Sequence, residues 1–303
     1  MPTQLSGLAE GLLFTKGQGT GNDFVLFADP EGRVDFTPEM ASSLADRHFG
    51  IGADGVIRAV LNAAVPEGQA ILEKEPSAVW FMDIRNADGS GAEMCGNGAR
   101  VFAAYLAHRG LVDLPDDGSL AIGTRAGVVW VHREDQGFSV DMGTWSFPGG
   151  QAAVRAGSDT QVQADGLDRV LPGLSVNLGN PHVVAKVSPT ELAALDLSQA
   201  PQLDPAPPEG ANTEFVAVAP VSLGDTCGTI DMRVFERGVG ETQSCGTGAC
   251  AAALAASAWA GPTGPSGWRV RLPGGELFVH FLGDQIQLTG PAELVAEGSL
   301  LGS

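Results

Sequence analysis

The chain has 303 residues, enough for two ordinary domains or one large one, and a hydrophobic content of 44% allows sizeable cores. Its formal charge of −19 argues against nucleic acids and anionic membrane surfaces as partners, because both bind clustered Lys and Arg. The N-terminal stretch lacks the basic start and apolar core of a signal peptide, and no apolar run is long enough to cross a bilayer. The four cysteines are too few for a disulfide scaffold. We therefore predict a cytoplasmic protein.

Short β-branched runs bounded by Gly, Pro, Asn or Asp predict strands along most of the chain. The predicted strands are 23–28, 79–84, 127–132, 138–142, 174–178, 182–187, 213–218, 229–235, 267–271 and 275–281. Thr37-Pro38 and Ser188-Pro189 each predict the start of a helix, the first ending near His48 and the second near Leu195. Two Ala-rich stretches predict longer helices at about 97–109 and 247–259. The Pro-, Glu- and Ala-rich segments 62–76 and 200–211 are expected to be surface loops.

One short phrase occurs twice. Residues 94–100 read MCGNGAR and residues 244–250 read SCGTGAC, each at the start of a predicted helix. A cysteine in that position meets unpaired backbone N–H groups and the positive end of the helix dipole, so we expect the pKa of each thiol to be lowered. The Gly after each Cys allows backbone amides to approach a substrate carboxylate. One such thiol suits a nucleophile or a redox group, whereas two suggest a pair of similar half-sites.

The likeness between the halves extends upstream of the cysteines. GNDFV at 21–25 corresponds to GNPHV at 179–183, and DIR at 83–85 corresponds to DMR at 231–233, in the same order. We therefore predict a duplicated β-rich unit wrapped on a central helix, with the boundary in a loop region at 143–172.

Two bases on opposite faces of one carbon are what stereochemical inversion requires, because one takes the proton and the other returns it. A thiol suits both roles, since its reference pKa is about 8.5 and shifts readily. Many racemases instead hold pyridoxal phosphate on a lysine, but this chain has few lysines and no recognisable phosphate cup, so we expect no cofactor. No metal is expected either, because there is no Cys-x-x-Cys and the histidines form no ligand-spaced cluster.

Other interpretations of these residues remain open at this point. Cys95 and Cys245 could form a redox pair or a disulfide, while Cys227 and Cys250 are expected to be small core residues. The adjacent Glu236-Arg237 could hold the amine and carboxylate of a zwitterion, or form a solvated ion-pair face. Four asparagines in turn-rich settings are either binding groups or plain turn residues: Asn22, Asn86, Asn180 and Asn212.

Together these phrases resemble the diaminopimelate epimerase family, the cofactor-independent epimerases of lysine and peptidoglycan-precursor biosynthesis. The resemblance covers almost the whole chain in the family's order. It rests on TKGQGTGNDFV (15–25), DRHFGIGADGV (46–56), RNADGSGAEMCGNGAR (85–100), NLGNPHVV (177–184), GANTEFV (210–216), ERGVGETQSCGTGAC (236–250) and LTGPAELVAEG (288–298).

The resemblance implies an isomerase that interconverts LL- and meso-diaminopimelate with Cys95 and Cys245 as acid/base thiols, Cys95 being the one that deprotonates the LL isomer. It implies that four backbone amides hold the carboxylate at the reacting carbon: Gly96, Asn97, Gly246 and Thr247. Six residues match those that hold the substrate, mainly its distal end: Asn22, Asn86, Asn180, Asn212, Glu236 and Arg237. His182 and Glu241 match supporting residues near the thiols.

The implied fold is α/β of the α+β type, with two pseudo-symmetric domains, each a curled, mostly antiparallel sheet around a central helix, and the active site in the cleft between them. The domains are expected at 1–142, carrying Cys95, and at 143–290, carrying Cys245, with the C-terminal strand 291–303 returning to the first. The resemblance also implies a homodimer. The chain departs from the family pattern at two places. The loop before Asn22 is altered, and Gly55 stands where some members have Gln. The segment 62–76 resembles an insertion.

Two other functions remain possible from the sequence. Proline and hydroxyproline racemases share the fold and the two cysteines, but they have no second amino-acid head for Asn86, Asn212 and Arg237 to bind. A redox-switch binding protein would use the Cys95/Cys245 pair without exchanging a substrate proton.

Overall fold

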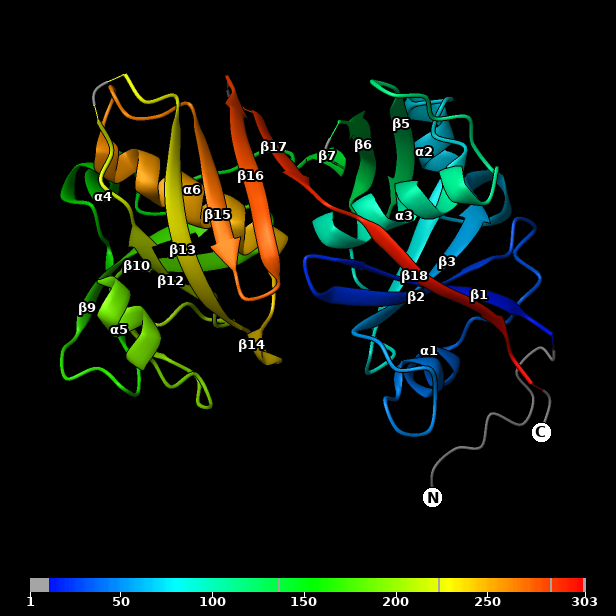
Figure 1. The fold of residues 1–303 in the computed structure, drawn as a ribbon, viewed down its shortest axis with the longest axis horizontal. Helices are drawn as coiled ribbons and strands as arrows, with labels where there is room; N and C mark the ends of the chain where they lie inside the picture. The colour runs from blue at the N-terminus through cyan, green and yellow to red at the C-terminus, as the bar shows by residue number, and fades with distance from the viewer. Residues whose placement is uncertain (1–10, 136, 223, 284, 302–303) are drawn as a thin grey trace. The chain divides into compact units, whose positions relative to one another are not determined.

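The computed structural model describes residues 11–301 apart from 136, 223 and 284. The chain divides into two compact units (Figure 1): unit 1 is Met1–Val140 with Gly290–Ser303, and unit 2 is Asp141–Thr289. The sequence predicts the boundary between residues 142 and 143 and the return of the chain at 291. Among the described residues, no helix has the length and apolar character needed to cross a membrane.

Most elements of unit 1 are strands arranged around one long helix. They are β1 (Leu13–Gly19), β2 (Asn22–Ala28), α1 (Pro38–Ala45), β3 (Gly55–Leu61), α2 (Gly68–Lys74), β4 (Trp80–Asn86), α3 (Gly96–His108), β5 (Ser119–Thr124), β6 (Gly127–Glu134), β7 (Gly137–Asp141) and β18 (Glu293–Ser299). β18 pairs antiparallel with β1, so the end of the chain adds a strand to unit 1 beside its beginning (Figure 1).

Unit 2 is built in the same manner. Its elements are α4 (Gly150–Ala156), β8 (Thr160–Gln163), β9 (Leu171–Asn177), β10 (Pro181–Lys186), α5 (Pro189–Ala194), β11 (Gln202–Asp204), β12 (Asn212–Val218), β13 (Cys227–Glu236), β14 (Gly240–Thr242), α6 (Gly246–Ala260), β15 (Gly267–Leu272), β16 (Gly275–Leu282) and β17 (Gln285–Gly290).

The strand pairings of the two units follow one scheme, which confirms the predicted pseudo-symmetry. β2 runs parallel to β3 as β10 does to β12, and β3 runs antiparallel to β4 as β12 does to β13. After the long helix, β4 is parallel to β5 as β13 is to β15, and an antiparallel hairpin follows in both units. The fold class predicted from the sequence is therefore correct within each unit: a curled, mixed but mostly antiparallel sheet with a central helix.

The central helices are buried because their sequences are apolar on nearly every side. In α6 the run Ala249–Ala253 is fully buried, and the small alanine side chains allow the surrounding strands to approach the helix closely. In α3 the buried residues include Phe102, Tyr105 and Leu106. Each unit therefore holds its central helix rigidly and presents the helix N-terminus at one end of the sheet.

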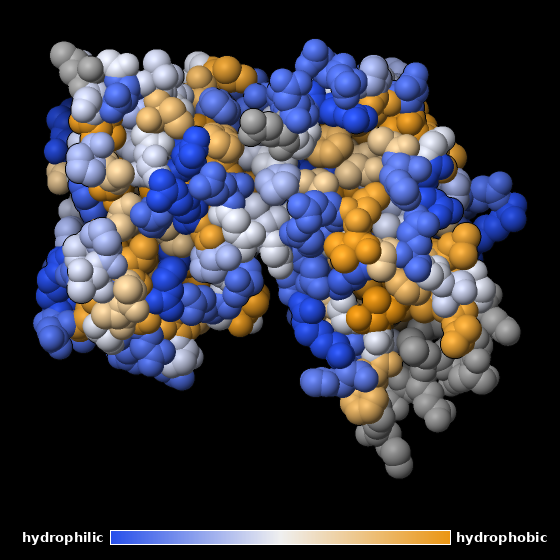
Figure 2. Space-filling model, viewed as in Figure 1, coloured by the Kyte–Doolittle hydropathy of each residue, from blue (hydrophilic) through white to orange (hydrophobic). Residues whose placement is uncertain are grey.

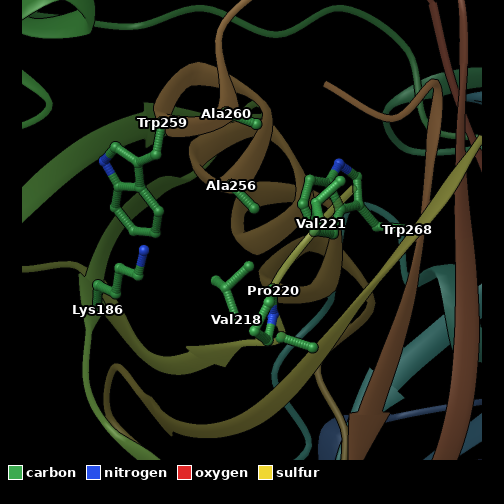
Figure 3. Close-up of a pocket in the computed structure, with 9 residues that line it drawn as sticks. Lys186, Val218, Pro220, Val221, Ala256, Trp259, Ala260 and Trp268 are labelled. Atoms are coloured by element: carbon green, nitrogen blue, oxygen red, sulfur yellow. The ribbon is translucent and has the colours of Figure 1, made fainter. Parts of the chain in front are cut away.

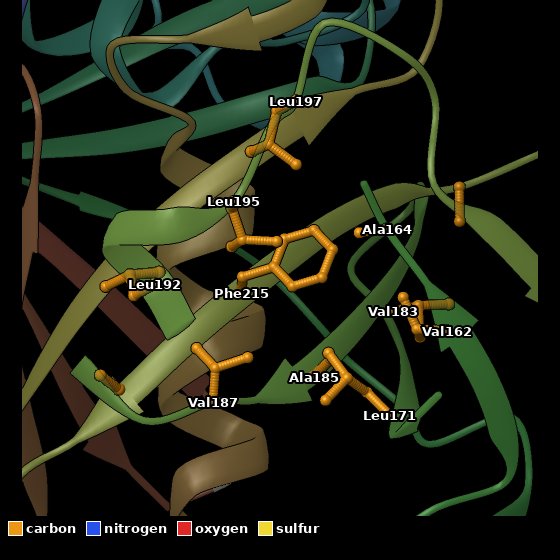
Figure 4. Packing of buried hydrophobic residues seen from close by; sticks show 12 residues of the cluster. Val162, Ala164, Leu171, Val183, Ala185, Val187, Leu192, Leu195, Leu197 and Phe215 are labelled. Atoms are coloured by element: carbon orange, nitrogen blue, oxygen red, sulfur yellow. The ribbon is translucent and has the colours of Figure 1, made fainter. Parts of the chain in front are cut away.

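A second apolar cluster covers the other side of the unit 2 sheet, around Phe215 of β12 (Figure 4). Phe215 packs in one cluster with Val183 and Ala185 from β10 and with Leu192 and Leu195 from α5 and its end. A capping box starts α5, in which Ser188 and Glu191 bond each other's backbone N–H groups. This packing fixes β10 and β12 side by side.

Four predictions about local structure are wrong. Helix α1 ends at Ala45 rather than near His48, because the carboxylate of Asp46 accepts the backbone N–H groups of His48 and Phe49 and turns the chain. The segment 62–76 is not a surface loop: it contains α2, and the buried Asn62 donates to the carbonyls of Ala78 and Trp80. The loop region 143–172 contains α4 and β8, and the loop 200–211 contains β11.

Candidate active site

Both cysteines of the repeated phrase cap a central helix. Cys95 is the N-cap of α3, and its Sγ accepts the N–H of Gly98 at 3.4 Å. Cys245 is the N-cap of α6, and its Sγ accepts the N–H of Gly248 at 3.3 Å. Both caps have extended backbone, so the two thiols occupy equivalent places in the two units. The four cysteines all lie among the described residues, and none of them forms a disulfide. Cys250 is buried as predicted, whereas Cys227 is exposed at the start of β13 and is not a core residue.

In unit 1 a tight hairpin brings Asn22 to Cys95. Thr20 and Gly21 form a two-residue turn with φ of 52° and 78°, a pair of left-handed conformations typical of hairpin turns, so Asn22 begins β2 opposite Gly19. The Cys95 thiol donates to Asn22 Oδ1 at 3.7 Å, and Asn97 Nδ2 donates to the same oxygen at 3.5 Å. The altered loop thus keeps Asn22 beside the thiol.

Charged groups fix the orientation of these amides. The fully buried Arg100 donates to Asn97 Oδ1 at 2.9 Å, and Asn22 Nδ2 donates to the carboxylate of Asp54 at 2.9 Å. Asp54 also pairs with Arg47, which in turn binds Asp23. Burial opposes ionisation of Asp23, but hydrogen bonds and charges from Arg47 and Lys16 outweigh it and lower its pKa to about 2.

In unit 2 a chain of polar contacts runs from a buried carboxylate to Cys245. Glu214 Oε1 lies 2.7 Å from His182 Nδ1, and His182 Nε2 lies 3.0 Å from Asn180 Oδ1. Asn180 Nδ2 donates to Thr247 Oγ1 at 3.4 Å, and that hydroxyl lies 3.5 Å from Cys245 Sγ. The parallel register of β10 and β12 sets Val184 opposite Glu214, two residues beyond His182.

The surroundings of Cys245 hold it as a thiol. Burial, together with the nearby carboxyl groups of Glu236 and Glu214, raises its pKa well above the usual value, and the contacts with Thr247 and Gly248 lower it by less. The predicted lowering is therefore wrong for this cysteine, because the helix end acts on a thiol that is removed from water. Burial also raises the pKa of Glu236, which accepts hydrogen bonds from Thr242 and Cys245.

Asn212, the first residue of β12, lies beside Arg237, which follows the last residue of β13. Asn212 Oδ1 accepts the backbone N–H of Arg237 at 2.9 Å. The side chain of Arg237 is 43% exposed; its guanidinium donates to the carbonyl of Glu209 at 2.8 Å and lies 3.7 Å from that residue's carboxylate. Glu241 forms a two-point ion pair with Arg233, at 2.7 and 3.0 Å, and Arg233 also binds the carbonyls at the end of α5.

Asn86 ends β4 in unit 1, where it is exposed and donates to Ser90 Oγ at 3.0 Å. Its register partner on β3 is Gly55. A Cβ at Gly55 would lie 2.8 Å from the carbonyl oxygen of Arg85, so no side chain fits there without a shift of the strand. Backbone therefore occupies the position at which some family members have Gln.

The structure brings part of the predicted residues to each thiol, whereas Asn86, Asn212, Arg237 and Glu241 make their contacts elsewhere in the two units. Unit 1 brings Asn22 and Asn97 to Cys95, and unit 2 brings Asn180, Thr247 and Glu236 to Cys245. A pocket of about 320 Å³ at the far end of α6 is lined by other residues, including Lys186, Trp259 and Trp268 (Figure 3).

Sequence reasoning missed three buried or charged residues of these groups: Asp54, Arg100 and Glu214. The sequence does carry a signal for Glu214, because this carboxylate lies in a predicted strand directly before the apolar run 215–218.

The profile of the diaminopimelate epimerase family matches residues 14–148 and 174–295. The chain belongs to this family. It is 45% identical to the diaminopimelate epimerase of Streptomyces coelicolor over 95% of this chain and 94% of the relative. It is 46% identical to that of Corynebacterium glutamicum over 95% of this chain and 97% of the relative.

Among solved structures, a PhzF-family phenazine biosynthesis protein from Bacillus anthracis superposes with a TM-score of 0.63 at 16% identity, covering 96% of this chain and 99% of that one. A hydroxyproline epimerase from Agrobacterium vitis superposes with a TM-score of 0.60 at 13% sequence identity, covering 97% of this chain and 92% of that one. These two likenesses concern the fold alone.

Proposed function

We propose that this chain is an isomerase that interconverts LL- and meso-diaminopimelate by two-thiol proton transfer at the α-carbon, in lysine and peptidoglycan-precursor biosynthesis. The observation that carries the proposal is the equivalent placement of Cys95 and Cys245 at the N-caps of the two central helices, in a chain of the diaminopimelate epimerase family. The mechanism requires the two thiols to act on opposite faces of one carbon.

In the LL-to-meso direction, Cys95 acts as the base and Cys245 as the acid. The α-proton passes to Cys95 Sγ, and the proton of Cys245 passes to the other face of the carbanion, leaving Cys245 as the thiolate. The raised pKa of Cys245 supports its role as the proton donor, because this thiol retains its proton until the carbanion forms. The reverse direction exchanges the roles.

The negative charge that develops at the α-carboxylate needs donors already in place. The first turns of α3 and α6 supply backbone N–H groups that lack helical partners, at Gly96, Asn97, Gly246 and Thr247. These amides and the two helix dipoles stabilise the carbanion, so the two thiols need no cofactor for the reaction.

The rest of the substrate is held by the polar residues around each thiol. We assign the distal carboxylate to Arg237, positioned by Asn212, and the distal ammonium to Glu236. The other proposed contacts are Asn22, Asn86 and Asn180. His182 and Glu241 support them from behind, His182 through Asn180 and Glu241 through Arg233.

Both thiols must stay reduced to act as bases, which supports a cytoplasmic location. We also propose a homodimer. Apolar side chains gather on the face of unit 1 where β1 and β18 lie (Figure 2), and Leu13 of β1 and Val295 of β18 are 53% and 64% exposed. Sedimentation should give twice the chain mass for the wild type, and Val295→Glu should weaken the association; a monomeric wild type would contradict this part of the proposal.

The direct test is exchange of solvent deuterium into the α-position of LL- and meso-diaminopimelate, with proline and lysine as controls. We expect exchange and interconversion for the two diaminopimelate isomers and very little for either control. Faster exchange into proline would favour a proline-type racemase, and no exchange at all would favour a redox-switch protein.

A further inference from the structure

Glu214 is the most deeply buried carboxylate of the unit 2 site. Its side chain and that of His182 both have no solvent exposure. Its Oε2 is buried and has no hydrogen-bond partner in the described structure, so the contact with His182 is its principal polar contact. A Cβ at Gly248 would lie 2.8 Å from Glu214 Oε1, which places this carboxylate directly beneath the first turn of α6.

The contacts of His182 define how many protons the pair holds. Asn180 uses its NH₂ group to donate to Thr247, so its carbonyl oxygen faces His182 Nε2 at 3.0 Å and requires a proton on that nitrogen. The 2.7 Å contact between Nδ1 and Glu214 requires another proton, on either atom. The pair therefore holds two protons and has no net charge.

The surroundings of the pair favour this state. The titratable groups that face it are the half-buried Glu236 from β13 and the buried Cys245 at the start of α6. A pair with only one proton would be an uncompensated negative charge in a dry interior, beside a second carboxyl group. Burial raises the pKa of Glu214, in agreement with retention of the proton.

The protonation state determines what Asn180 presents to the active site. If His182 Nε2 lost its proton, Asn180 would turn its NH₂ group toward it and its carbonyl toward Thr247. The Thr247 hydroxyl would then donate to Asn180 rather than to Cys245. With Nε2 protonated, the hydroxyl remains available to donate to the Cys245 sulfur, 3.5 Å away, as the thiolate forms.

We propose that Glu214 is a positioning residue: paired with His182, it keeps a proton on His182 Nε2 and so fixes Asn180 with its amide group toward Thr247 and Cys245. This proposal rests on the proposed function, because it describes how Cys245 is assisted in releasing its proton.

The test combines nitrogen NMR with kinetics on three full-length variants. Glu214→Gln keeps a donor for His182 Nδ1 and should leave His182 protonated on Nε2. Glu214→Met removes the donor. Glu191→Met is the control, because Glu191 caps α5 and pairs with Arg169 in the same unit without contacting His182. With ¹⁵N-labelled histidine, the His182 signal is assigned by its loss in His182→Gln.

We expect the wild type, Glu214→Gln and Glu191→Met to show a protonated Nε2 at neutral pH. Glu214→Met should lose this fixed state, and its kcat should fall on the order of tenfold, equivalent to about 1.4 kcal/mol, while Glu214→Gln largely restores kcat. An unprotonated Nε2 in the wild type would overturn the proposal even if Glu214→Met failed to fold. Equal kcat for Glu214→Met and Glu214→Gln would also overturn it. Because the NMR result needs no substrate, it is independent of whether diaminopimelate is the substrate.

Discussion

Replacing Arg237 by Met should separate substrate recognition from folding. The Arg237 side chain is 43% exposed and its partner Glu209 is 85% exposed, so their ion pair contributes at most about 1 kcal/mol to the free energy of unfolding. Asn212 accepts the backbone N–H of residue 237, a bond that Met retains. The variant should therefore fold almost as stably as the wild type.

The expected effect on catalysis is larger. In a closed, dry site a charge-assisted hydrogen bond to the distal carboxylate is worth roughly 1.5–3 kcal/mol, and the substrate group left without its partner adds to the loss. Arg237→Met should therefore lower kcat/KM for diaminopimelate on the order of 10²-fold or more. Part of the loss should appear in kcat, because the proposed mechanism uses distal binding energy to align the α-carbon with the thiols.

The assay is epimerisation of LL-diaminopimelate followed by chiral chromatography, alongside denaturant unfolding. Arg269→Met is a matched control, because Arg269 is 44% exposed in the same unit and pairs with Glu276 on the neighbouring strand. Lysine, which lacks the distal carboxylate, should be a very poor substrate for the wild type and insensitive to Arg237→Met. Unchanged turnover of diaminopimelate by Arg237→Met would refute the assignment of this residue, while the two-thiol mechanism could still hold.

Cys95→Ala and Cys245→Ala should each abolish epimerisation, whereas the Ser variants should fold but lose about 10²–10⁴-fold in rate, the usual range for one acid–base group; a near-normal rate in either Ala variant, measured in the same assay, would exclude a two-base mechanism. If both thiols reach one carbon, air oxidation should join them in a disulfide that inactivates the enzyme and that dithiothreitol reverses; intact-mass analysis showing two free thiols in an air-inactivated sample would contradict this. The pKa of Asp23 is lowered in the folded state to about 2 from 3.8, so its stabilising contribution is present above about pH 4 and is lost as the pH falls through about 2. In denaturant titrations, the difference in the free energy of unfolding between wild type and Asp23→Asn should therefore shrink as the pH falls from about 4 to about 2. A difference that does not change with pH would show that Arg47 and Lys16 do not lower the pKa of Asp23.

The two Cys-capped helices could be predicted almost to the residue because their signals are local. The sequence predicts helices at about 97–109 and 247–259, and the structure has them at Gly96–His108 and Gly246–Ala260. Each helix start depends only on the cap cysteine, which accepts the N–H of the residue three positions later, and on the alanine-rich run that follows. Neither signal requires a contact with a distant part of the chain. The internal repeat likewise indicated the shared topology, since each matched segment occupies the same step of the strand order in both units.

Elements that depend on distant contacts were missed. Helix α2 lies between two prolines and buries only Gly68 and Ile71, too few positions to give a helical period. Strand β1 contains two glycines in LFTKGQG and is held in the sheet by β2 and β18, the latter from the far end of the chain. The pKa of Cys245 belongs to the same class, because burial and two carboxyl groups distant in sequence outweigh the local helix end.

The divergence of the repeated phrase accounts for the difference between the half-sites. In unit 1 the residue five positions after the cysteine is Arg100, a permanent donor that fixes the Asn97 amide, and Asn22 turns its carbonyl toward Cys95. In unit 2 the corresponding position is Cys250, which has no charge to fix an amide, and Thr247 replaces Asn97. The orientation of the Asn180 amide is instead fixed by His182, which contacts Asn180 Oδ1 and is itself held by Glu214. Asn22 therefore presents an acceptor to its thiol and Asn180 presents a donor to the group beside its own. A duplicated scaffold has in this way acquired two unlike environments, which suits the proposed mechanism, because one thiol takes a proton in it while the other gives one.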